Sequence, residues 1–173
     1  FFIDRSKKIL MVNEQDSLPG RIDEMQFNES HFVNNSSMKG PFPEGMSEIF
    51  LGMGCFWGAE RLFWNKEGVY VTSVGYAGGF TPNPLYEEVC SGLTGHTEVV
   101  HVVFDPKIIS LQEILKIFWE GHDPTQGMRQ GNDMGTQYRS AIYYSDETLL
   151  DQIKKSEVNY SDALKKEGYP EIT

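Results

Sequence analysis

The sequence predicts an α+β fold, namely a ferredoxin-like split βαβ sandwich with a mixed or antiparallel sheet and helices packed on it. Two observations lead to this prediction. Segments with strand and helix patterns follow each other in the order β-α-β-β-α-β-α, which is the order of the split βαβ motif. The second and third strand segments, 69–77 and 96–104, are adjacent, which breaks the strict alternation that a doubly wound sheet needs.

Four segments have the residue pattern of strands. From Ser47 onward, glycine and polar turn residues separate apolar segments at regular intervals. The third strand segment is apolar on both faces towards its end, which is typical of a central strand. The predicted strands cover residues 47–54, 69–77, 96–104 and 138–145.

Three segments have the pattern of amphipathic helices, at 55–68, 110–121 and 146–168. In the second helix, Ser110 and Glu113 match the capping box. In the third, Ser145 is the expected N-cap and Gly168 the expected stop. The first helix presents one apolar face, formed by Phe56, Ala59, Leu62 and Phe63.

The chain of 173 residues predicts one domain with an arm. Residues 1–44 have no sustained period and are rich in Asn, Ser, Gly and Pro, so we expect an extended, irregular and partly mobile arm. Residues 45–173 are expected to form the domain. Two connections within it, 76–95 and 121–137, are long enough to suggest functional loops.

Composition narrows the classes of function. With 15 basic and 25 acidic residues the net charge is −10, and no Lys/Arg cluster is present, which argues against binding nucleic acid or anionic membranes. No apolar run reaches the ~18 residues of a membrane span. Two cysteines do not make a secreted disulfide framework. We therefore expect a monomer in a reducing compartment, the cytoplasm, or the mitochondrion if a transit peptide was removed.

The stretch "LGMGCFWGAE" places Cys55 between a predicted strand and a predicted helix. The free N–H groups and the dipole of a helix start stabilise an anion, which favours the thiolate, a nucleophile. Gly54 and Gly58 allow a sharp turn and the close approach of a ligand. Phe56 and Trp57 are consecutive, so we expect one to pack inward and the other to line a pocket near the sulfur. A buried, inert cysteine is the alternative.

Other kinds of site fit this sequence less well. The dinucleotide-binding fingerprint needs glycine where Trp57 stands. The spacing of Cys55, Cys90 and the histidines does not match a zinc site, so we expect no metal. A Cys–His hydrolase, with His122 oriented by Asp123, stays open as an alternative to a local hydrogen-bonding role for His122.

Glu98 is the second candidate for chemistry. In an extended strand its side chain shares a face with Val100, Val102 and Phe104. Desolvation would then raise its pKa, and a protonated carboxyl could donate a hydrogen bond at neutral pH. An exposed carboxylate at a frayed strand end is an equally good interpretation. The long loops add further donors and a carboxylate, namely Tyr86, Asp133, Tyr138 and Arg139.

Three blocks of the sequence resemble the signature of one enzyme family. They are "GCFWGAERLFW", "GYAGGFTPNPLYEEVCSGLTGHTEVV" and "FWEGHDPTQGMRQGNDMGTQYRSAIY". They are similar to the blocks of peptide methionine sulfoxide reductase A, and the resemblance spans about residues 42–173. It implies that 45–173 is a catalytic domain, a peptide-methionine (S)-S-oxide reductase that repairs proteins after oxidative stress.

The resemblance also implies roles for individual residues. Cys55 attacks the sulfoxide sulfur and becomes a sulfenic acid, and Glu98 supplies the proton to the oxygen. The substrate-binding residues are Phe56 and Trp57 for the methyl group, Tyr86 and Tyr138 for the oxygen, and Asp133 as support. The substrates are free methionine S-sulfoxide and oxidised proteins, no metal or organic cofactor takes part, and thioredoxin or another dithiol is the external reductant.

Many family members continue after "IT" with a tail that carries one or two resolving cysteines, and the printed sequence has none of it. The C-terminal tail is therefore expected to be missing from a fragment, or the sulfenic acid is reduced directly by an external thiol. Cys90 is expected to be structural. A non-catalytic module that binds methionine sulfoxide or senses oxidation is the alternative function.

Overall fold

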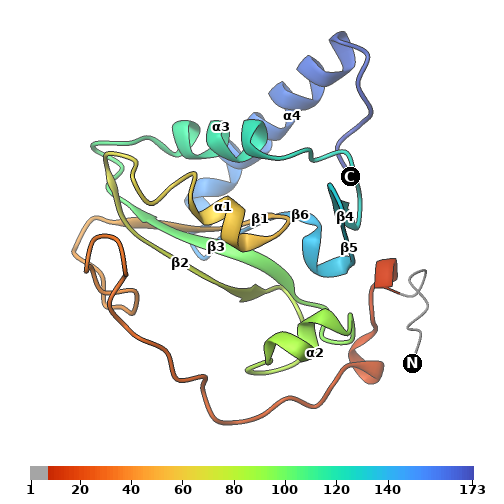
Figure 1. Cartoon of the computed structure of the whole chain (residues 1–173). Helices are drawn as coiled ribbons and strands as arrows, with labels where there is room; N and C mark the ends of the chain where they lie inside the picture. The colour runs from red at the N-terminus through yellow and green to blue at the C-terminus, as the bar shows by residue number, and fades with distance from the viewer. Residues whose placement is uncertain (1–7) are drawn as a thin grey trace.

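The computed structural model describes residues 8–173, which form an α+β fold with a four-stranded antiparallel sheet and helices (Figure 1). The sheet strands are β1 (Ser47–Met53), β2 (Val69–Ala77), β3 (Thr97–Phe104) and β6 (Ser140–Tyr143). A separate two-stranded ribbon consists of β4 (Arg129–Gln130) and β5 (Asp133–Met134). The helices are α1 (Phe56–Glu60), α2 (Tyr86–Cys90), α3 (Leu111–Gly121) and α4 (Leu150–Lys166), with 3-10 turns η2 (Glu14–Asp16), η3 (Thr136–Tyr138) and η4 (Glu147–Leu149).

The strand order in the sheet is β2-β3-β1-β6, and every neighbouring pair is antiparallel. β3 is central, as its apolar sequence predicted, because it pairs with β2 on one side and β1 on the other. The register places Phe50 opposite His101 on one side and Tyr76 opposite Glu98 on the other. The carboxyl end of β1 therefore lies near the amino end of β3.

The hydrophobic core lies between one face of the sheet and the helices α1, α3 and α4. Strands β1 and β3 contribute alternate residues to it, as expected for the covered face of a sheet. The first helix contributes the apolar face that its sequence predicted. The core residues from these elements and from the turns after α1 are Ile49, Leu51, Met53, Phe56, Ala59, Phe63, Val100, Val102, Phe104, Leu111, Ile114, Leu115, Phe118, Trp119 and Ile153.

Two predicted helices are shorter than expected. After α1 the backbone continues in turns, in which the Leu62 N–H donates to Ala59 O over 3.1 Å; Gly58 and several aromatic residues in this segment have low helix propensity. The fourth helix begins at Leu150 after η4. Its segment is capped by the Asp146 carboxylate, which accepts from Thr148 N, so the prediction that Ser145 is the cap was wrong. The Ser145 hydroxyl instead donates to Glu48.

Other predictions for local structure were correct or nearly so. The bounds of β2 are those predicted, and Ser110 and Glu113 form the capping box of α3. The last strand is limited to Ser140–Tyr143, because Tyr138 lies in η3. The first long connection contains α2, and the second contains β4 and β5.

The described part of the arm, residues 8–44, runs along the domain from α2 towards the outer edge of β2 (Figure 1). Near the strand, His31 is buried, and its Nε2 lies 3.1 Å from Thr72 Oγ1. Asn34 donates to the Tyr70 carbonyl over 2.9 Å. On the sheet face opposite the helices, Phe42 packs edge-on against His101. Side chains of the arm thus bind the outer strand β2 and pack on the central strand β3.

Candidate active site

Cys55 occupies the sharp corner between β1 and α1. Gly54 has a φ of +85°, and a Cβ atom at that position would lie 2.6 Å from the Gln130 side chain. Only glycine fits both the conformation and the space. Cys55 itself is the N-cap residue of α1, and its side chain is exposed. The exposed position does not match the alternative of a buried, inert cysteine.

Glu98 lies directly behind this corner. One of its carboxylate oxygens accepts a hydrogen bond from the Phe56 N–H over 3.1 Å. The side chain is only 2% exposed, so it is buried on the face of Val100 and Val102 and does not fray into solvent. Burial raises the pKa of Glu98, and the negative charge of Asp133 adds to this, whereas the Phe56 N–H acts in the opposite direction.

The two aromatic residues after Cys55 point in different directions. Phe56 is 7% exposed and belongs to the core, where its ring contacts Tyr76 at a centroid distance of 5.7 Å. Trp57 is 75% exposed. One ring therefore packs inward and the other faces solvent, as consecutive positions at a helix start require. Trp57 lines a cavity of about 370 Å³ together with Gly58, Glu60, Arg61, Trp64 and Val74.

Tyr86 and Tyr138 reach the same site from the two long connections. The hydrogen bond and the charge of Cys90 are the main causes that raise the pKa of Tyr86, and the charges of Glu98 and Cys55 add to them. Burial raises the pKa of Tyr138 to about 12, with smaller contributions from Glu98 and Cys90. Tyr138 and Cys90 line one cavity, and Cys90 ends the helix that Tyr86 begins.

Sequence reasoning missed Tyr76. It lies opposite Glu98 in the β2–β3 register and touches Phe56. Burial raises its pKa, and the charge of Glu98 raises it further, so Tyr76 stays a neutral hydroxyl at the back of the site. Antiparallel pairing of 69–77 with 96–104 could have located it, because the two strands are consecutive and their ends are marked by glycines.

Asp133 is exposed on β5, and its charge raises the pKa of both Glu98 and Tyr138. It lines a cavity of about 350 Å³ together with Lys8, Cys90, Asn132, Met134, Gln137 and Tyr138. Gln137, also missed by sequence reasoning, is buried, and its Oε1 has no hydrogen-bond partner among residues 8–173. The cavity thus adjoins the site from the side of the second connection.

His122 does not form a catalytic pair with Cys55. Its Nδ1 lies 2.7 Å from Phe118 O, and its Nε2 lies 2.8 Å from the Ser140 hydroxyl. Asp123 accepts instead from Thr125 within its own turn. Burial lowers the pKa of His122, which fits a locally bonded, neutral imidazole. The Cys–His hydrolase therefore lacks its geometry.

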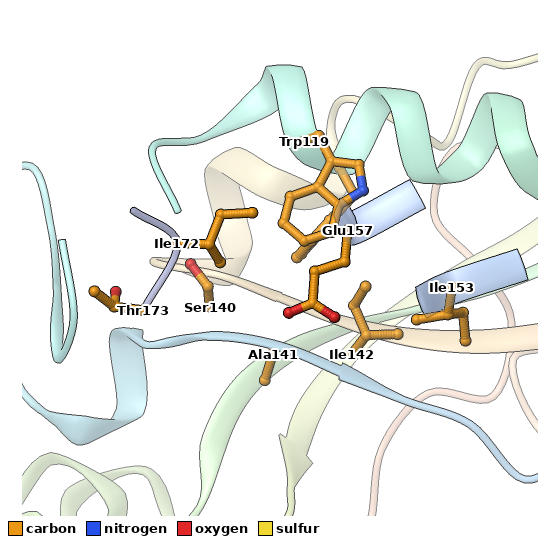
Figure 2. A pocket seen from close by; sticks show the side chains of 9 residues that line it. Trp119, Ser140, Ala141, Ile142, Ile153, Glu157, Ile172 and Thr173 are labelled. Carbon is orange, nitrogen blue, oxygen red and sulfur yellow. The ribbon is translucent and has the colours of Figure 1, made fainter. Parts of the chain in front are cut away.

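Another cavity, of about 270 Å³, lies between α3, α4 and β6 (Figure 2). The Glu157 side chain extends beside Trp119 and ends near Ala141 and Ile142 of β6. None of the predicted site residues lines this cavity. Among residues 8–173, no three His, Cys, Asp or Glu side chains are grouped as metal ligands would be, and no helix is long and apolar enough to cross a membrane.

The sequence is similar to known proteins over most of its length. The sequence profile of a family described as peptide methionine sulfoxide reductase matches residues 47–171. The chain belongs to this family. A peptide methionine sulfoxide reductase MsrA from Brucella anthropi is 60% identical over 167 residues, which cover 96% of this chain and 77% of that protein.

Solved structures of the peptide methionine sulfoxide reductase family match the fold. Methionine sulfoxide reductase A of Corynebacterium diphtheriae is 44% identical, with a TM-score of 0.88 over 95% of this chain and 78% of its own. Reduced Mxr1 from Saccharomyces cerevisiae is 34% identical, with a TM-score of 0.67 over 70% of this chain and 72% of its own. Mxr1 has also been solved in complex with Trx2.

Proposed function

We propose that the chain is a peptide-methionine (S)-S-oxide reductase, which converts methionine S-sulfoxide, free or in proteins, to methionine. Family membership supports the activity. Within the structure, the observation that carries the proposal is the buried Glu98 carboxyl, bonded over 3.1 Å to the N–H of the residue after the exposed Cys55. A nucleophile and a proton donor thereby face the same small space.

The mechanism uses these two groups in turn. The Cys55 thiolate attacks the sulfoxide sulfur while Glu98 protonates the sulfoxide oxygen, which builds up negative charge as the S–O bond weakens. The new bond between the two sulfur atoms then breaks as the oxygen, carrying that proton, moves to Cys55. Methionine leaves with the electron pair of this bond, and Cys55 becomes a sulfenic acid. A dithiol then attacks this sulfur, releases water and is oxidised to a disulfide, which returns Cys55 to the thiol.

The surrounding side chains bind the substrate in this proposal. Trp57 and Phe56 contact the methyl group, and the Tyr86 and Tyr138 hydroxyls donate to the oxygen. Both phenols keep their protons at neutral pH, because the pKa of each is raised. Asp133 supports the site by its charge, which holds the pKa of Glu98 up. No metal or organic cofactor is needed, since thiol and carboxyl groups complete the proton and electron balance.

Several broader assignments belong to the same proposal. The strand pairing supports a ferredoxin-like arrangement, in which β1-α1-β2 encloses β3, with residues 1–44 as arm and 45–173 as catalytic domain. The two free cysteines support a reducing compartment, and we propose the cytoplasm. Oxidised proteins and free methionine sulfoxide are the substrates, thioredoxin or a similar dithiol is the reductant, and the enzyme acts as a monomer.

Trp57→Ala is expected to lower kcat/KM for methionine sulfoxide roughly tenfold, because an apolar wall next to a methyl group contributes about 1–3 kcal/mol to discrimination. The loss should appear mainly in KM. Phe32→Ala is a matched control, since Phe32 is an almost fully exposed aromatic residue of the arm. Steady-state kinetics with excess dithiol measure both variants; equal kcat/KM values for the Trp57→Ala and wild-type proteins would remove Trp57 from the substrate site.

The same assay separates the reductase from a sensor that is oxidised once. A reductase forms many equivalents of methionine when dithiol is in excess. A sensor stops after one equivalent of methionine, with Cys55 left in its oxidised form.

A further inference from the structure

Arg21 of the arm forms a bidentate ion pair with α2. Its Nη1 and Nη2 lie 3.0 and 2.7 Å from the two carboxylate oxygens of Glu88. The two ends of the pair are far apart in the sequence but adjacent in space, where the arm passes α2 (Figure 1). Two parallel N–H···O bonds fix the orientation of a carboxylate, which a single contact does not.

Glu88 is also the residue that holds the first turn of α2. Its Oε2 accepts from the Leu85 N–H over 2.8 Å, which is half of a capping box. Tyr86, the first residue of the helix, follows directly. A helix of five residues is not stable by itself. The position of Tyr86 therefore depends on the contacts that fix the Glu88 side chain. The bidentate ion pair with Arg21 is such a contact.

The arm also forms hydrogen bonds with the chain on both sides of α2. Before the helix, Thr81 Oγ1 donates to Leu18 O over 2.9 Å, and Asn83 Nδ2 donates to Arg21 O over 3.0 Å. After it, Leu18 N donates to Leu93 O over 3.0 Å. The segment that carries Tyr86 is thus clamped at both ends by one short piece of the arm.

The arm passes close to Pro82, and this close approach requires a glycine in the arm. Gly20 has a φ of +63°, and a Cβ there would lie 2.2 Å from the Pro82 carbonyl oxygen. The neighbouring Arg21 N–H donates to that same oxygen over 3.1 Å. Only glycine lets the arm come close enough for Arg21 to reach Glu88.

We propose that Arg21 is a positioning residue for the reductase reaction, which acts through Glu88 to hold the Tyr86 hydroxyl against the sulfoxide oxygen. This inference rests on the proposed function and assigns the arm a part in it. Both side chains of the pair are partly exposed, so its contribution to global stability is small. Its contribution to the rate is larger, because small displacements of a catalytic hydrogen-bond donor are costly.

A double-mutant cycle with Tyr86→Phe tests the proposal. Arg21→Ala should lower the single-turnover rate roughly tenfold in the wild-type background, the order of loss expected for a misplaced donor. In the Tyr86→Phe background the same change should lower the rate less than about twofold, since its effect passes through the missing hydroxyl. Hydrogen exchange of residues 86–90 should also be faster in Arg21→Ala.

Lys39→Ala is the matched control, because Lys39 forms its ion pairs with Glu24 and Glu29 inside the arm; it should keep the wild-type rate. Equal losses from Arg21→Ala in both backgrounds, or a wild-type rate in Arg21→Ala, would overturn the proposal. If Arg21→Ala does not fold, Arg21→Lys and Glu88→Gln complete the same cycle.

A wild-type rate in Tyr86→Phe would overturn the role of Tyr86 and this inference with it. The reductase assignment itself would be unaffected, because it depends on Cys55 and Glu98.

Discussion

Cys55→Ser is expected to abolish the reduction of methionine sulfoxide, with a loss of about 10⁴-fold or more in rate, the scale seen when a nucleophile is removed. A serine hydroxyl keeps the position at the corner between β1 and α1 but is almost entirely protonated at neutral pH. It also cannot accept the oxygen as a sulfenic acid. Methionine release in a single turnover without added reductant measures the effect directly.

Cys90→Ser is the matched control for this variant. Cys90 is the second free cysteine, and it lies at the end of α2 beside Tyr86. Its replacement should leave the first turnover within about threefold of the wild-type rate, because in the proposed mechanism the Cys90 thiol neither attacks the sulfoxide sulfur nor protonates its oxygen. Full activity in Cys55→Ser, or loss of the first turnover in Cys90→Ser alone, would contradict the assignment of the nucleophile.

Glu98→Gln is expected to slow the chemical step about 10²- to 10³-fold, the usual cost of removing one donor to a developing oxyanion. The amide fills the same buried space and can still bond to the oxygen, so substrate affinity should change little. The amide can donate a hydrogen bond, but it has no acidic proton to transfer to the oxygen. Rapid-quench kinetics separate the rate of the chemical step from substrate affinity. An unchanged rate of the chemical step would remove Glu98 from the mechanism.

The pH dependence gives a second signature of Glu98. Its pKa is raised above the ordinary value of 4.5, mainly by burial. The protonated donor is therefore fully present below that value and is lost as the pH rises through the folded-state pKa, so the rate of the chemical step falls there. Protonation of Glu98 also stabilises the folded protein, and this contribution to the free energy of unfolding is likewise lost as the pH rises through the folded-state pKa. Glu98→Gln should lack this falling limb in single-turnover rates and in thermal melts alike.

Local signals in the sequence predicted much of the fold. The bounds of β2 and the capping box of α3 depend on residues that are close in the chain, and both were predicted correctly. The length of α1 was overestimated, because an apolar face is compatible with successive turns as well as with a helix. The cap of the segment formed by η4 and α4 was missed by one residue, since Ser145 and Asp146 are both good N-cap types.

The assembly of the site could be predicted only in part. Cys55 stood out because glycines and a strand-to-helix boundary surround it. Sequence reasoning left Glu98 open between a buried and an exposed position, and its burial depends on a partner 42 residues away, the Phe56 N–H. Tyr76 was missed because its place is set by strand register. The Arg21–Glu88 pair was missed because no local pattern in an irregular arm indicates its partner.

The most direct measurement for the central claim is the location of the sulfenic acid after one turnover. The reduced protein is incubated with one equivalent of methionine S-sulfoxide and no reductant, in the presence of a 1,3-diketone that traps sulfenic acids, and then digested for mass spectrometry. We predict one equivalent of methionine and a label on the peptide that contains Cys55. Methionine formed while Cys55 stays unlabelled and reduced, or a label on Cys90 alone, would contradict the account.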